Sequence, residues 1–120
     1  MKRGPQQREM SGPDAQLVYI TVPDRATAIA LAEGLVEGCL AAGANLAGPV
    51  LSVYRWQGVV RRAEEWQIFA QTANFGALRD WVASKHPHIV PCIISVPILA
   101  GLEPFLDWIR ANGAGQCRQP

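Results

Sequence analysis

Two histidines and a cysteine lie close together in one short run of the sequence, which reads His86-Pro87-His88-Ile89-Val90-Pro91-Cys92. Imidazole and thiolate groups bind copper and zinc well, and thiolate favours Cu(I). Side chains alternate between the two faces of an extended chain, so His86 and His88 share one face. Cys92 shares that face if the segment stays extended. The pattern therefore predicts a metal site formed by His86, His88 and Cys92, with copper preferred over zinc.

The same residues also fit a purely structural interpretation. His86 can end a helix, where its side chain bonds the last carbonyl groups and complements the helix dipole. Cys92 is then an ordinary buried thiol, which is the preferred interpretation because no strict metal-binding motif surrounds it. A Cys–His nucleophile is conceivable, yet the sequence shows no oxyanion-hole loop and no third orienting group. We therefore expect a protein that is not an enzyme.

The cysteines are widely spaced and odd in number, at Cys39, Cys92 and Cys117. This argues against a disulfide framework and favours a reducing cytoplasm. Cys39 is expected to pack in the core, because it falls on the apolar stripe of a predicted helix. Cys117 is expected to be a free, exposed thiol near the C-terminus.

Length and charge exclude several classes of protein. The 120 residues fit one domain, and 49% of them are hydrophobic. The 11 basic and 10 acidic side chains nearly balance, so neither nucleic acid nor an anionic membrane is an expected partner. No apolar run approaches the ~20 residues that cross a bilayer. We expect a flexible leader at residues 1–15, one domain at residues 16–113 and a flexible tail at residues 114–120.

The apolar periodicities predict the order β-α-β-β-α-β followed by a short helix. The expected elements are a strand at 17–22, a helix at 25–42, a hairpin whose arms lie within 44–72, a helix at 75–86, a strand at 92–96 and a helix from 104 to 112. Asp24 and Asn74 are suitable N-caps, and Gly43 suits a left-handed stop after the first helix. This is the ferredoxin-like order of an α+β fold. Its antiparallel sheet would carry both long helices on one face and leave the other face uncovered.

The long hairpin is the expected contact between copies of the chain. An arm of about ten residues spans ~33 Å, which is longer than so small a core needs. Tyr54, Trp56 and Trp66 would lie on this projecting ribbon and need a partner to cover them. We expect these aromatic residues to be interface anchors first and the lining of a pocket second.

Five groups of residues in this chain carry a recognisable pattern. They are Thr21-Val22-Pro23-Asp24; Leu40-Ala41-Ala42 with Asn45; Ser52-Val53-Tyr54-Arg55-Trp56-Gln57-Gly58; His86-Pro87 with Val90-Pro91; and Pro97-Ile98 with Gly101 and Phe105-Leu106-Asp107-Trp108-Ile109. In order and spacing the chain resembles the CutA divalent-cation-tolerance proteins from about Leu17 to Ile109. This resemblance implies a ferredoxin-like protomer in a homotrimer built around extended hairpins, similar to PII-type signalling trimers. It also implies a cytoplasmic role in tolerance of divalent metals, with copper as the usual candidate.

The chain departs from the family pattern at several positions. Gly43 stands where the family has a cysteine, and Gln71 stands where it has a lysine. His88, Ile89 and Cys92 replace a tyrosine and two glutamates. The resemblance implies that such positions line a crevice between subunits, whose expected residues in this chain are Tyr54, Trp56, Trp66 and Gln71.

Three functional hypotheses follow. The first is binding of copper, or less preferably zinc, through His86, His88 and Cys92 in the response to metal ions. The second is a PII-like regulatory trimer that senses a small metabolite near Trp56. The third is a structural trimer that presents a surface to an unidentified protein partner.

Overall fold

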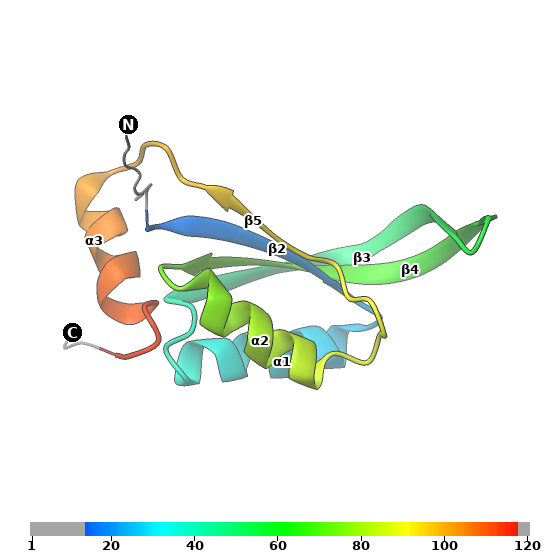
Figure 1. Ribbon diagram of the computed structural model, residues 1–120, viewed down its shortest axis with the longest axis horizontal. Helices are drawn as coiled ribbons and strands as arrows, with labels where there is room; N and C mark the ends of the chain where they lie inside the picture. Colours follow the sequence, from blue (N-terminus) through cyan, green and yellow to red (C-terminus); the bar gives the residue numbers. More distant parts are fainter. Residues whose placement is uncertain (1–13, 118–120) are drawn as a thin grey trace, which may run out of the picture.

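The computed structural model describes residues 14–117, which form one four-stranded antiparallel sheet and three helices (Figure 1). The elements are β2 (Gln16–Val22), α1 (Arg25–Glu37), β3 (Gly43–Trp56), β4 (Val59–Thr72), α2 (Phe75–Lys85), β5 (Ile93–Pro97) and α3 (Glu103–Asn112). The strands lie in the order β3-β4-β2-β5, and all three pairings are antiparallel. The predicted α+β, ferredoxin-like order is thereby confirmed. Within residues 14–117, no helix is long and apolar enough to cross a membrane.

One face of the sheet is covered by α1 and α2 (Figure 1). Alternation along β2 places Val18, Ile20 and Val22 on this face, and β4 adds Ile68 and Ala70; all five are buried. The two helices begin where the sequence predicts. Their N-cap side chains are hydrogen-bonded to the first turn, from the Thr27 N–H in α1 and from the Ala77 N–H in α2.

Helix α1 ends earlier than expected. It stops at Glu37, and the left-handed residue after its C-cap is Cys39, with a φ of 57°. The Leu40 N–H donates to the Leu35 carbonyl and the Cys39 N–H to the Val36 carbonyl, which is the Schellman pattern. Gly43, the predicted stop, already belongs to β3.

The sequence pattern alone does not decide which apolar residues of α1 are buried. The buried positions are Ala28, Leu31, Ala32 and Leu35, whereas Val36 is largely exposed. A helix of mostly apolar residues offers more than one stripe at a 3.6-residue period, so the packing against the sheet decides which one is buried.

Gly34 sits where the two long helices meet. A Cβ at this position would lie only 2.5 Å from the Trp81 ring of α2. The indole therefore fills the space that a side chain on α1 would occupy. Gly34 therefore allows the two helices to pack closely on each other.

The β3–β4 hairpin projects beyond the helices (Figure 1). Each of its strands has 14 residues. The pairing shifts register between Ala47 and Val50, at Pro49, which lies on the edge strand β3 and lacks the N–H that strand pairing needs. The hairpin turn is at Gln57 and Gly58, both of which have a positive φ.

Helix α3 covers the end of the sheet opposite the hairpin tip (Figure 1). It builds a second small core in which Leu106 and Ile109 pack with Ala15 and Ala42. Ala15 was assigned to the flexible leader, but the structure buries it. The rest of that segment, residues 1–13, lies outside the described part of the chain.

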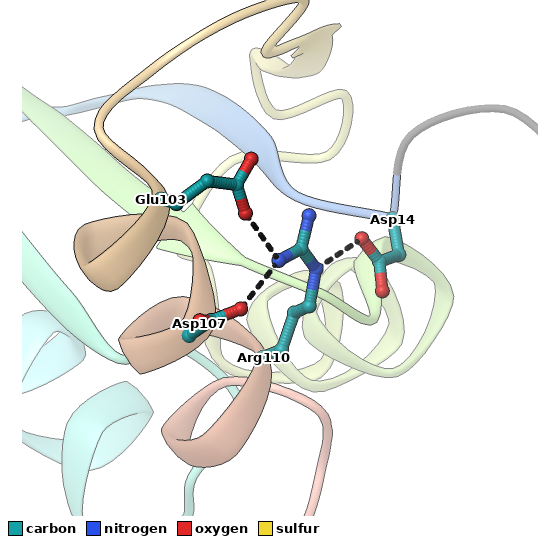
Figure 2. Close-up of polar contacts among 4 residues, drawn as sticks. All are labelled: Asp14, Glu103, Asp107 and Arg110. Atoms are coloured by element: carbon teal, nitrogen blue, oxygen red, sulfur yellow. Dashed lines mark hydrogen bonds and ion pairs between the residues drawn. The ribbon is translucent and has the colours of Figure 1, made fainter.

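Arg110 of α3 ties this helix to the residue that precedes the sheet. Figure 2 shows its guanidinium between three carboxylates. Nε donates to Asp14 at 3.0 Å and Nη1 donates to Asp107 at 2.9 Å, while Glu103 lies 3.8 Å away. These exposed pairs fix geometry more than stability, because solvent-exposed ion pairs contribute little free energy.

Two expectations about the cysteines are corrected. Cys39 and Cys117 form a disulfide, and Cys92 is a free, exposed thiol. An odd number of cysteines shows only that they cannot all be paired within one chain. It could not exclude one bridge between residues that the fold brings together.

Candidate functional site

The cavity that gathers most of the candidate side chains lies between the outer half of the hairpin and the segment that joins α2 to β5. It has a volume of about 690 Å³. Its lining residues come from four parts of the chain: Tyr19, Thr21, Ser52, Val53, Tyr54, Trp56, Glu65, Pro87, His88, Ile89, Val90 and Cys92. Polar, aromatic and thiol groups therefore share one apolar hollow.

Strand alternation explains why these side chains meet. In the β2–β4 pairing Thr21 is opposite Gln67, and in the β3–β4 pairing Tyr54 is opposite Arg61. Paired residues point to the same face, and so do every second residue along a strand. Tyr19, Thr21, Tyr54 and Glu65 thus share the sheet face opposite the helices.

His86 is buried, with 8% of its surface exposed, and both ring nitrogens are hydrogen-bonded. Nε2 lies 2.7 Å from the Thr21 carbonyl oxygen, and Nδ1 accepts from the His88 N–H at 3.1 Å. Only the neutral tautomer with its proton on Nε2 satisfies both partners. No ring nitrogen is then left for a metal, so in this arrangement His86 positions the loop and does not act as a ligand.

His88 and Cys92 both line the cavity. The His88 ring lies 5.0 Å from the His86 ring, centre to centre. The Cys92 carbonyl accepts from the Thr21 N–H at 3.4 Å. Thr21 therefore holds both ends of the 86–92 segment. Across residues 14–117 no group of three or more His, Cys, Asp or Glu side chains is close enough to hold a metal ion. Of the three predicted metal ligands, only His88 and Cys92 line the cavity.

The four residues expected in the crevice lie in three different places. Tyr54 and Trp56 line the cavity. Trp66 lies on the helix face of the sheet, where it packs against the core and lies 5.9 Å from the Arg25 guanidinium. Its position in β4 has the opposite parity to Glu65, so its side chain lies on the opposite sheet face from Tyr54.

Gln71 lies near the end of β4, away from the hairpin turn. Its side-chain amide donates to Asn45 Oδ1 at 3.4 Å, and its backbone carbonyl accepts from the Ala42 N–H. It does not belong to the residues that line the cavity. Tyr19 and Glu65 are among the lining residues that sequence reasoning missed, and strand parity relative to Tyr54 was the signal that would have found these two.

The fold and the sequence match one family. The family model described as "CutA1 divalent ion tolerance protein" matches residues 16–112. This chain belongs to the CutA family. The match spans the whole sheet and all three helices, so the resemblance predicted from the sequence is confirmed over the described domain.

Similar proteins support this assignment. The divalent-cation tolerance protein CutA of Thermus thermophilus is 39% identical over 99 residues, which is 81% of this chain and 96% of that protein. The divalent-cation tolerance protein CutA of Salmonella newport is 34% identical over 107 residues, which is 88% of this chain and 93% of that protein. The solved structure of CutA from Archaeoglobus fulgidus has a TM-score of 0.79 at 36% identity and covers 82% of this chain and 98% of that chain. That protein is described as periplasmic.

Proposed function

We propose that this CutA protein is a non-enzymatic, cytoplasmic homotrimer that binds copper in the hairpin cavity as part of a response to metal ions. His88 and Cys92 are the proposed ligands. The observation that carries the proposal is that these two side chains line the same cavity while His86 holds the loop between them. A thiolate with an imidazole is a soft donor set that suits Cu(I), with zinc as the second choice.

The proposed trimer is supported by the uncovered sheet face. Ile94 and Val96 of β5 lie on this face and are 53% and 49% exposed. Tyr19 and Phe69 stack beside them, with ring centres 5.4 Å apart. A contiguous apolar surface of this kind marks an interface. The cytoplasmic location is part of the proposal, and cell fractionation with compartment markers tests it.

Metal titration of the reduced, chelator-treated protein, followed by native mass spectrometry, tests the copper site. We expect uptake of Cu(I) in a fixed ratio per chain, and loss of uptake in the His88→Ala and Cys92→Ser variants. Ile89→Ala is the matched control, because it changes the same loop without removing a donor atom. Uptake that survives both donor substitutions would place the metal elsewhere, and absence of uptake by the parent protein would reject the copper site.

The aromatic lining favours a second candidate, a PII-like trimer that senses a small metabolite. Tyr54 and Trp56 face the cavity, and its size suits a small organic ligand. A metabolite that binds there should change the fluorescence of the parent protein, and the change should disappear in Trp56→Phe. Copper should not reproduce it. A protein that responds to neither ligand would favour a trimer that serves as a surface for a protein partner.

A further inference from the structure

The C-terminal segment 113–117 folds back onto the turn that follows α1, although residues 114–117 were expected to be part of a flexible tail (Figure 1). The Gly115 N–H donates to the Cys39 carbonyl at 2.8 Å, and the Asn74 amide donates to the Ala114 carbonyl at 3.3 Å. Cys39 and Cys117 are joined here, with their Cα atoms 5.2 Å apart across 78 positions of sequence. Residues 118–120 lie outside the described part of the chain.

The segment also touches the end of β4. A Cβ on Gly113 would lie 2.9 Å from the Ala42 nitrogen and 3.2 Å from the Gln71 oxygen, so three stretches of backbone meet at this glycine. The Ala73 N–H donates to the Gly113 carbonyl at 2.7 Å. The buried Thr72 hydroxyl lies within hydrogen-bond distance of both the Leu40 and the Gly113 carbonyls, at 2.7 and 3.1 Å. The segment is therefore docked on the Leu40–Ala42 turn and on β4 by bonds that do not depend on sulfur.

Cys39 occupies a position that usually belongs to glycine. Its φ of 57° lies in the left-handed region, which costs free energy for a residue with a Cβ. The Schellman hydrogen bonds around it would form equally well with glycine at this site. The thiol of Cys39 is therefore not needed to end the helix, and it is bonded to Cys117.

The two sulfurs differ in access to solvent. Cys39 is 4% exposed, whereas Cys117 is exposed. We propose that Cys39 and Cys117 form a thiol–disulfide modification site, at which small disulfides such as glutathione disulfide oxidise the pair and fasten segment 113–117 onto the Leu40–Ala42 turn. The site is independent of the copper proposal, because Cys92 lines the cavity and has no part in the pair.

The exchange proceeds in two balanced steps. The exposed Cys117 thiolate attacks one sulfur of glutathione disulfide, a mixed disulfide forms, and one glutathione thiolate leaves. The Cys39 thiolate then attacks the Cys117 sulfur, forms the intramolecular bond and releases the second glutathione. Two cysteine thiols are oxidised, one glutathione disulfide is reduced, and the two thiol protons pass through water to the two glutathione products. Excess reduced glutathione runs the same steps in reverse.

Equilibration of the full chain in glutathione buffers from reducing to oxidising tests the site. Free thiols are then alkylated and mapped by mass spectrometry, and hydrogen exchange is measured on the same samples. We expect the Cys39–Cys117 bond to form as the buffer becomes oxidising. Protection of the Gly115 amide should increase with it, and the unfolding temperature should rise by about 10 °C or more, because the bond closes a long loop.

Two variants separate the modification site from a general effect of oxidation. Cys117→Ser should keep the fold, exchange at Gly115 like the reduced protein in every buffer, and show no rise in unfolding temperature. Cys92→Ser should respond like the parent chain. The proposal is overturned if Cys39 and Cys117 stay alkylatable in oxidising buffer while Cys92 takes up glutathione. It is also overturned if Cys117 bonds another copy of the chain, or if protection at Gly115 is independent of the buffer.

Discussion

The imidazole of His86 and the backbone of Thr21 lie 65 positions apart in sequence, yet His86 Nε2 donates to the Thr21 carbonyl oxygen at 2.7 Å. The Thr21 N–H also donates to the Cys92 carbonyl. The end of β2 thus anchors both ends of the 86–92 segment. This segment forms one wall of the cavity, so His86 acts on the candidate site by holding the chain in place.

Replacing His86 with alanine should destabilise the protein. The substitution removes two hydrogen bonds and leaves the Thr21 carbonyl and the His88 N–H without these partners in a partly buried region. We expect a loss of about 2 kcal/mol in the free energy of unfolding. Urea denaturation measures it. His88→Ala is the matched control and should change stability by less than about 0.5 kcal/mol, because it keeps the backbone donor. Equal losses in the two variants would contradict an anchoring role for His86.

Gly34→Ala should also destabilise the protein, although alanine is the better helix former. The new methyl group would meet the Trp81 ring at 2.5 Å. Overpacking costs about 1–3 kcal/mol, which exceeds the roughly 1 kcal/mol that alanine adds to a helix. Thermal unfolding of the purified variant is the measurement.

Gly76→Ala serves as the control for Gly34→Ala. This glycine lies in the first turn of α2, where the nearest atoms to a new Cβ are 3.8 Å away. We expect it to stabilise by about 0.4–1 kcal/mol through the unfolded state. The pair Gly34→Ala with Trp81→Leu should recover stability relative to Trp81→Leu alone. If Gly34→Ala is harmless with Trp81 present, the indole is free to move and the packing argument fails.

The cap of α1 should contribute a pH dependence in acid. The hydrogen bond from the Thr27 backbone N–H lowers the pKa of Asp24 below its ordinary value of 3.8. A lowered folded-state pKa stabilises the protein above pH 3.8, and this contribution is lost as the pH falls through the lower folded value. Asp24→Asn keeps a side-chain oxygen for the cap but does not titrate. Its unfolding midpoint should fall less steeply below pH 4 than that of the parent chain. Identical slopes would show that another group controls this range.

Charge on the uncovered sheet face should break the proposed trimer. Ile94→Asp places a carboxylate on the strand that carries Val96 and lies beside Tyr19. Burying an unpaired charge in an interface is strongly unfavourable, so we expect mainly monomer at micromolar concentration. Native mass spectrometry or light scattering measures the mass. Leu99→Asp is the control, because Leu99 is 86% exposed and lies outside the sheet. A trimer that survives Ile94→Asp would show that the subunits meet elsewhere.

Local signals in the sequence were sufficient for the order of the elements and for the family. Asp24 and Asn74 cap their helices through bonds to residues three positions away, and Gln57-Gly58 turns the hairpin within two residues. Each of these features depends on neighbours in the chain, so composition and period reveal it. The bulge at Pro49 could be predicted for the same reason, because proline lacks the N–H that a strand pairing needs.

Tertiary structure alone decided which chemical groups meet. The sequence by itself determined the ferredoxin-like order and placed His88 and Cys92 near each other. It did not show that both ring nitrogens of His86 form hydrogen bonds, one of them to a strand far away in sequence. Nor did it show that Cys39 lies beside Cys117. It also grouped Trp66 with Tyr54 and Trp56, whereas Trp66 packs against the core on the helix face, because strand parity has meaning only relative to the helices that cover the sheet. Such contacts depend on long-range packing and register, for which neighbouring residues carry no signal.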